Sequence, residues 1–115
     1  MSQIIERKRL LETTFAKCRI DSVDVREIRL EPNQQSGRHL HPCTVVGYVV
    51  SGTAVFQIEG GEEQILPSGS AFCEPADAVI ANFGNASSAE PMTFVAFYLK
   101  DGEQDLIHML DGKSS

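Results

Sequence analysis

At 115 residues, 42% of them hydrophobic and 23% charged, the chain is long enough for one globular domain with a single core. Its net charge of −6 argues against binding to nucleic acid or to an anionic membrane surface, and its apolar runs are too short to cross a bilayer. Three cysteines without paired spacing, and an N-terminus without the apolar core of a secretion signal, predict a protein of the reducing cytoplasm.

The N-terminal residues 1–22 can be interpreted either as a short helix or as an extended arm. Ser2 is a candidate helix cap, and Ile5, Leu10 and Leu11 have roughly helical spacing. The resulting apolar stripe is thin, so an extended arm along the rest of the protein is the alternative.

Residues 23–100 have the pattern of β-strands. In the segment SVDVREIRL the apolar alternation slips between Val25 and Ile28, which indicates either a bulge or a switch of the buried face. Short β-rich segments follow, separated by turns that contain Gly or Pro, and Gly60-Gly61 is placed at the tip of a two-residue hairpin turn. Many short strands without interleaved helices predict an all-β antiparallel barrel or sandwich, followed by a closing element and tail at residues 101–115.

Two stretches of this β-rich region resemble the paired motifs of the cupin superfamily. The first, residues 32–52, contains the pair His39-x-His41, and the second, residues 69–85, reads GSAFCEPADAVIANFGN. The resemblance covers about residues 23–100 and implies a double-stranded β-helix, the jelly-roll barrel of small single-domain bacterial cupins. It also implies a homodimer, because small cupins commonly pair their barrels and an unprotected sheet edge is normally covered.

The same resemblance implies a metal site that this sequence preserves only in part. Cupins bind a divalent metal inside the barrel through three histidines and a glutamate. His39 and His41 match the first two histidines, whereas Val45 stands at the glutamate position and Ile80 at the third-histidine position. Side chains two residues apart on a strand share a face, so the two imidazoles should converge, and imidazole is a common ligand of transition metals. The alternative is that both histidines are relics, hydrogen-bonded in a polar pocket.

Glu74 is the candidate for a third ligand. It has the strand parity of Phe72, which in cupins faces the interior, and a carboxylate buried there must be paired or protonated. With His39 and His41 it would form the two-histidine, one-carboxylate set of non-haem iron oxygenases, suited to Fe, Zn, Ni or Mn. The alternative is that Glu74 only accepts a hydrogen bond from a histidine or from a backbone amide.

Three further residues are expected to line the pocket with Glu74, namely Gly47, Gln57 and Ile80. A glycine inside a strand leaves room either for a ligand or for a bulky neighbouring side chain. The cysteines Cys43 and Cys73 are expected to pack as small apolar residues.

The sequence therefore supports two hypotheses of different classes. The first is an enzyme-like site in which a weakly bound divalent metal acts on a small molecule, with dioxygenase chemistry by analogy if the metal is iron. The second is a non-catalytic module that binds or senses a small molecule, which the apolar Val45 and Ile80 at ligand positions favour. The sequence offers neither a Gly-x-Ser-x-Gly nucleophile nor a phosphate-binding loop.

Overall fold

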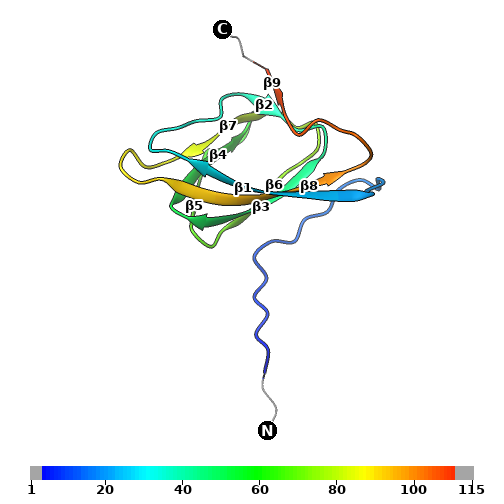
Figure 1. Ribbon diagram of the computed structural model, residues 1–115, viewed down its shortest axis with the longest axis horizontal. Coiled ribbons are helices and arrows are strands. Elements are labelled where there is room, and N and C mark those ends of the chain that lie inside the picture. Colours follow the sequence, from blue (N-terminus) through cyan, green and yellow to red (C-terminus); the bar gives the residue numbers. More distant parts are fainter. Residues whose placement is uncertain (1–3, 111–115) are drawn as a thin grey trace.

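The computed structural model describes residues 4–110, and its regular structure in these residues consists of β-strands (Figure 1). The strands are β1 (Ser22–Leu30), β2 (His39–Leu40), β3 (Thr44–Ser51), β4 (Thr53–Ile58), β5 (Gln64–Pro67), β6 (Ala71–Glu74), β7 (Ile80–Asn85), β8 (Met92–Lys100) and β9 (His108–Met109). They form two antiparallel sheets with the orders β1-β8-β3-β6 and β5-β4-β7-β2-β9. Within residues 4–110 no helix has the length and hydrophobicity that a membrane crossing requires. The predicted all-β double-stranded β-helix is confirmed.

The core lies between the two sheets because side chains alternate between the faces of each strand. Along β3, for example, Val45 and Val49 are buried while Tyr48 is turned outward. The centre of the core is a cluster of aromatic rings whose centroids lie 4.7–6.0 Å apart. The cluster consists of Phe56, Phe72, Phe83 and Phe94.

The slip in the apolar pattern of β1 marks a change in the face that carries the apolar residues, and the predicted bulge and the predicted switch of the buried face are both absent. β1 pairs with β8 along its whole length without a register shift, so there is no bulge in this strand. Val25 is 56% exposed on the outer face, whereas Ile28 and Leu30 pack against the core. The second half of β1 therefore contributes to the interior, and its first half contributes to the outer surface.

The predicted hairpin forms from β4 and β5, but the prediction that a two-residue turn connects them is wrong. The strands end at Ile58 and resume at Gln64, so the loop has five residues, 59–63. Gly60 alone adopts a positive φ, 87°, while the amide of Gly61 donates to the carbonyl oxygen of Ile58 at 2.9 Å. The tighter turn would need positive φ at both central residues of its type I′ form.

Residues 4–21 form an extended arm, and the predicted N-terminal helix is not present in them. Leu10 is 47% exposed and Ile5 68% exposed, so the thin apolar stripe has no surface in the monomer against which a helix could be stabilised. Ser2, the predicted cap, lies outside the described residues. The last part of the arm touches the barrel, while its first part projects away from it (Figure 1).

The C-terminal segment crosses the end of the barrel and returns as β9. This short strand pairs with β2, placing His108 opposite Leu40. Residues 111–115, the predicted tail, lie outside the described residues. The segment before β9 therefore lies next to the strand that carries His39.

Candidate metal centre

His39 and His41 converge because they stand two residues apart where β2 ends. Both are buried, with 2% and 4% of their surface exposed. Their ring centroids lie 5.0 Å apart with the rings nearly perpendicular. The convergence expected from strand alternation is therefore present.

Backbone carbonyl groups fix the orientation of both imidazoles. The Nδ1 atom of His39 lies 2.8 Å from the carbonyl oxygen of Gly37, and that of His41 lies 2.6 Å from the carbonyl oxygen of Leu106. A carbonyl oxygen only accepts, so each Nδ1 carries the proton and donates it. With Nδ1 engaged in this way, Nε2 of each ring is the nitrogen that faces the site, which is the arrangement of metal-binding histidines in proteins.

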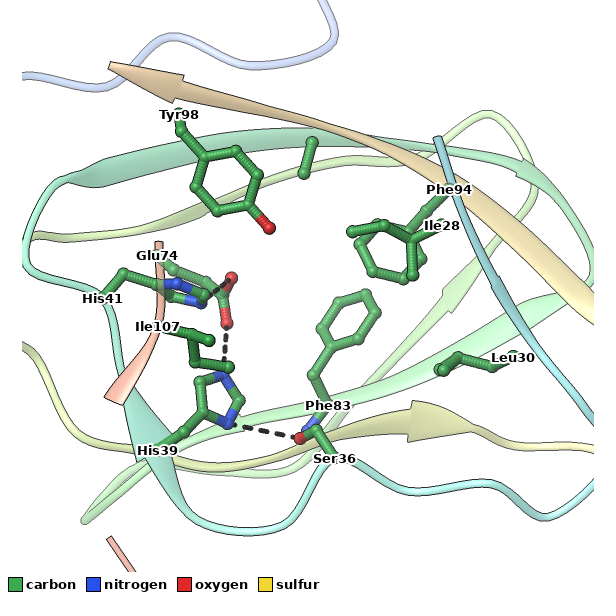
Figure 2. Close-up of a pocket in the computed structure, with 11 residues that line it drawn as sticks. Ile28, Leu30, Ser36, His39, His41, Glu74, Phe83, Phe94, Tyr98 and Ile107 are labelled. Atoms are coloured by element: carbon green, nitrogen blue, oxygen red, sulfur yellow. Dashed lines mark hydrogen bonds and ion pairs between the residues drawn. The ribbon is translucent and has the colours of Figure 1, made fainter. Parts of the chain in front are cut away.

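Glu74, the last residue of β6, brings a carboxylate between the two Nε2 atoms (Figure 2). Its Oε2 lies 3.1 Å from Nε2 of His41, and its Oε1 lies 3.5 Å from Nε2 of His39. The side chain is buried, and Oε1 has no hydrogen-bond partner among the described residues. The ligand atoms of these three residues lie within 4.8 Å of one another.

The register of the sheet explains how Glu74 reaches the site. Glu74 on β6 is paired directly with Val45 on β3. Directly paired residues of an antiparallel sheet lie side by side on the same face. The carboxylate therefore enters from the strand next to the one on which the cupin motif would place it.

The charges of the site stabilise each other. Burial by itself raises the pKa of Glu74, but the contacts with His39 and His41 outweigh it and hold that pKa below its usual value. Burial likewise lowers the pKa of His41, but the hydrogen bond and the charge of Glu74 outweigh it, so the pKa is raised. An ionised carboxylate beside two imidazoles attracts either a proton or a metal cation.

A cavity of about 150 Å³ opens beside the three residues. Its remaining wall is mostly apolar and includes Ile28, Phe83 and Phe94 (Figure 2). The hydroxyl of Tyr98 points into the cavity, and its ring lies 5.8 Å from that of His41. Burial raises the pKa of Tyr98, so at neutral pH the hydroxyl keeps its proton and can donate it to a ligand.

Of the residues expected to line the pocket, the structure places Glu74 there and the other three elsewhere. A Cβ at Gly47 would overlap the ring of Phe72, so this glycine makes room for a bulky neighbour, the second of its two expected roles. Gln57 donates its side-chain amide to the carbonyl oxygen of Gly61, within the hairpin loop. Ile80 is completely buried and is paired with His39 across β2 and β7.

Sequence reasoning missed two contributors to the site. Tyr98 has the same strand parity as Phe94, so the alternation in MTFVAFYLK was a signal that could have identified it. The contact of Leu106 with His41 had no such signal, because it uses a backbone carbonyl of an irregular segment.

Comparison with known proteins identifies the fold family. The family model described as "Cupin domain" matches residues 26–98, and the chain therefore belongs to the cupin family. No curated protein sequence matches it.

Solved structures of this fold include proteins with different activities. A cupin-like protein from Thermotoga maritima is 22% identical, with a TM-score of 0.64 over 76% of this chain and 64% of that one. A DMSP lyase from Ruegeria pomeroyi is 18% identical, with a TM-score of 0.69 over 81% of this chain and 46% of that one. A sugar phosphate isomerase from Silicibacter pomeroyi is 28% identical, with a TM-score of 0.60 over 70% of this chain and 52% of that one. The chain spans about half to two thirds of the length of these proteins.

Proposed function

We propose that this cupin barrel binds one divalent transition metal through His39, His41 and Glu74 and presents it to a small molecule in the adjacent cavity. The observation that carries the proposal is the pair of imidazoles whose Nδ1 atoms are held by backbone carbonyl groups, so that both Nε2 atoms point at Glu74. The unpartnered Oε1 of Glu74 also supports it, since a buried polar atom left unsatisfied costs about 1–3 kcal/mol. A bound cation would remove that cost.

The donor set limits the kind of metal. Two imidazole nitrogens and one carboxylate oxygen suit Fe, Zn, Ni or Mn, and three protein ligands leave coordination positions open to water or to a ligand. Iron held in this way would supply oxygen-activating chemistry of the dioxygenase kind, because this ligand set is that of the non-haem iron oxygenases.

The cavity limits the kind of ligand. At about 150 Å³ it is smaller than the ~300–1,000 Å³ of pockets that hold drug-sized molecules, so the ligand is small. Phe83 and Phe94 provide an apolar wall, while the Tyr98 hydroxyl offers a hydrogen-bond donor near Glu74. A short molecule with one apolar end and one oxygen-bearing or acidic end fits this division.

A second candidate function is non-catalytic binding or sensing of such a molecule. The observation that favours it is that Val45 and Ile80, which replace two of the family's four ligands, are both fully buried apolar residues. The hydrogen bond between His41 and Glu74 also satisfies much of the site by itself. In this case the cytoplasmic protein would respond to ligand without turning it over.

Metal titration of the chelator-stripped protein tests the first proposal. We expect one Fe(II), Zn, Ni or Mn ion per chain by calorimetry, and Glu74→Gln should weaken the binding at least about tenfold, because it replaces a charged ligand with a neutral amide of the same shape. His108→Ala is the matched control, since His108 is exposed and pairs with Asp105 on the surface. Binding that survives Glu74→Gln but not His108→Ala would contradict the assignment.

Oxygen uptake separates the two candidates. The iron-loaded protein should consume oxygen in the presence of a small acidic or ketonic compound that fits the cavity if the site is catalytic. Saturable ligand binding with unchanged oxygen concentration would favour the sensing module instead.

A further inference from the structure

The C-terminal residues 103–110, called the strap here, are attached to one short stretch of the barrel. Near the start of the strap, the side-chain amide of Gln104 donates to the carbonyl oxygen of Pro42 at 3.2 Å. At its end, the backbone amide of Leu110 donates to the carbonyl oxygen of Arg38 at 3.1 Å. The two ends of the strap are therefore held on either side of the pair of histidines.

Between these two bonds the strap runs along the histidines themselves. Its strand β9 pairs with both residues of β2, which places Met109 opposite His39. One residue beyond β2, Nδ1 of His41 donates to the carbonyl oxygen of Leu106 at 2.6 Å. Each of the residues 38–42 therefore contacts the strap.

The strap also forms the mouth of the cavity beside the metal centre. Ile107 is part of the cavity wall (Figure 2). Among the described residues that line this cavity it alone is exposed, at 42%, whereas the three candidate metal ligands are only 2–4% exposed. Ile107 therefore lies where the cavity meets the solvent.

Little apart from these contacts holds the strap in place. Only Leu106 packs against the core, and every other strap residue except Gln104 is exposed. Gly102, directly before the strap, has a positive φ of 68°, a conformation that favours glycine. β9 is a two-residue strand at the edge of its sheet, so the other strands keep their partners without it. A segment with few buried apolar contacts and exposed hydrogen bonds opens at a low free energy, so the strap can open while the barrel stays folded.

Opening would change the metal centre through His41. Without the strap, Nδ1 of His41 loses the carbonyl group of Leu106 that orients its ring. Loss of such a partner of a metal-binding histidine typically weakens metal binding tenfold to hundredfold. The closed strap therefore favours a bound metal, and by linkage a bound metal favours the closed strap by the same factor.

We propose that the strap is the gate of the metal centre. It opens at Gly102 to admit metal and ligand, and it closes over the cavity when a metal-bound His41 donates to the carbonyl group of Leu106. This inference rests on the proposed metal site of His39, His41 and Glu74 and adds its regulation, because closure of the strap and occupancy of the site form one coupled equilibrium.

Hydrogen–deuterium exchange of the full chain, read by mass spectrometry, tests the coupling. Saturating Zn(II) should slow exchange of the strap amides about tenfold relative to the chelated protein. The loop 86–91, between β7 and β8, is the internal reference and should exchange at the same rate in both samples. Glu74→Gln should remove most of the slowing, because zinc then binds weakly.

A loosened variant tests the same coupling from the other side. Gln104→Ala/Leu110→Pro removes the bonds at the two ends of the strap, and it should raise the dissociation constant for Zn(II) in calorimetry about tenfold. His108→Ala is the matched control, because it removes only the surface pair with Asp105 and leaves the backbone pairing of β9 intact. The control should bind zinc like the parent chain.

The outcomes separate the gate from the metal site. A parent chain that binds no zinc would overturn the metal site and the gate with it. Zinc binding that depends on Glu74 but leaves exchange of the strap unchanged would overturn the gate alone, and so would a loosened variant that binds zinc as tightly as the parent. If circular dichroism shows that the loosened variant is unfolded, the exchange experiment on the parent chain decides by itself.

Discussion

Ile80→His should convert the two-histidine centre into one with three imidazoles. Ile80 is fully buried and is paired directly with His39, so a side chain at position 80 lies beside that imidazole on the same face of the sheet. With Glu74 entering from β6, the variant would offer four ligands where the parent offers three.

The size of the effect follows from burial and linkage. Replacing a fully buried isoleucine by a polar ring costs about 1.5–3 kcal/mol without metal, which is a fall in melting temperature of roughly 5–20 °C for a domain of this size. If the extra ligand tightens metal binding about a hundredfold, the same free metal concentration returns about 2.7 kcal/mol. The chelated variant should therefore melt below the parent and recover most of the difference when metal is added.

Thermal unfolding followed by circular dichroism, with chelator and then with zinc, nickel or cobalt, is the assay. Ile65→His, on an exposed position of β5, controls for an added imidazole that has no neighbouring ligands. If the folded Ile80→His variant and the parent respond equally to metal, the side chain at position 80 does not face the histidines, and the ligand geometry derived from the β2–β7 register is wrong.

Three further predictions concern the metal-free protein. The pKa of Glu74 is lowered, so its ionised form stabilises the fold above the ordinary pKa of 4.5; the pKa of His41 is raised, so its protonated form stabilises the fold below the ordinary pKa of 6.5. Thermal melts of the chelated protein should therefore show the largest stabilisation by this site between pH 4.5 and 6.5 and a smaller one toward pH 8. Glu74→Gln should remove this pH dependence. Gly47→Ala should cost about 1–3 kcal/mol in urea unfolding because its methyl group meets the Phe72 ring, and a Phe72→Leu background should reduce that cost; equal costs in the two backgrounds would count against the steric explanation. Asn85→Ala should cost roughly 1–3 kcal/mol in the same assay, since the buried amide donates to three backbone carbonyl groups, whereas a loss below 0.5 kcal/mol, typical of surface sites, would mean that those bonds contribute little.

Much of the barrel could be predicted because the signals for strands and turns lie in residues that are close together in the sequence. The alternation of apolar residues and the placement of Gly and Pro indicate short strands, and two spaced motifs are sufficient to identify the family. The face that His39 and His41 share also follows from strand geometry alone. Of the two interpretations of the N-terminal residues, the structure has the extended arm in residues 4–21 and not the short helix, because helical spacing over so few residues has little weight without a surface to bury it.

The sequence by itself determined three features: the succession of short strands with its two spaced motifs, the shared face of His39 and His41, and the orientation of Glu74 toward the interior. Only the tertiary structure decided that Gly47 and Gln57 do not line the cavity and that Tyr98 does. It also decided that the backbone carbonyl of Leu106, in the C-terminal segment, orients His41. The physical reason is that parity fixes the face on which a side chain lies, whereas the contacts across that face depend on register between strands far apart in the chain and on how large neighbouring rings fill the space.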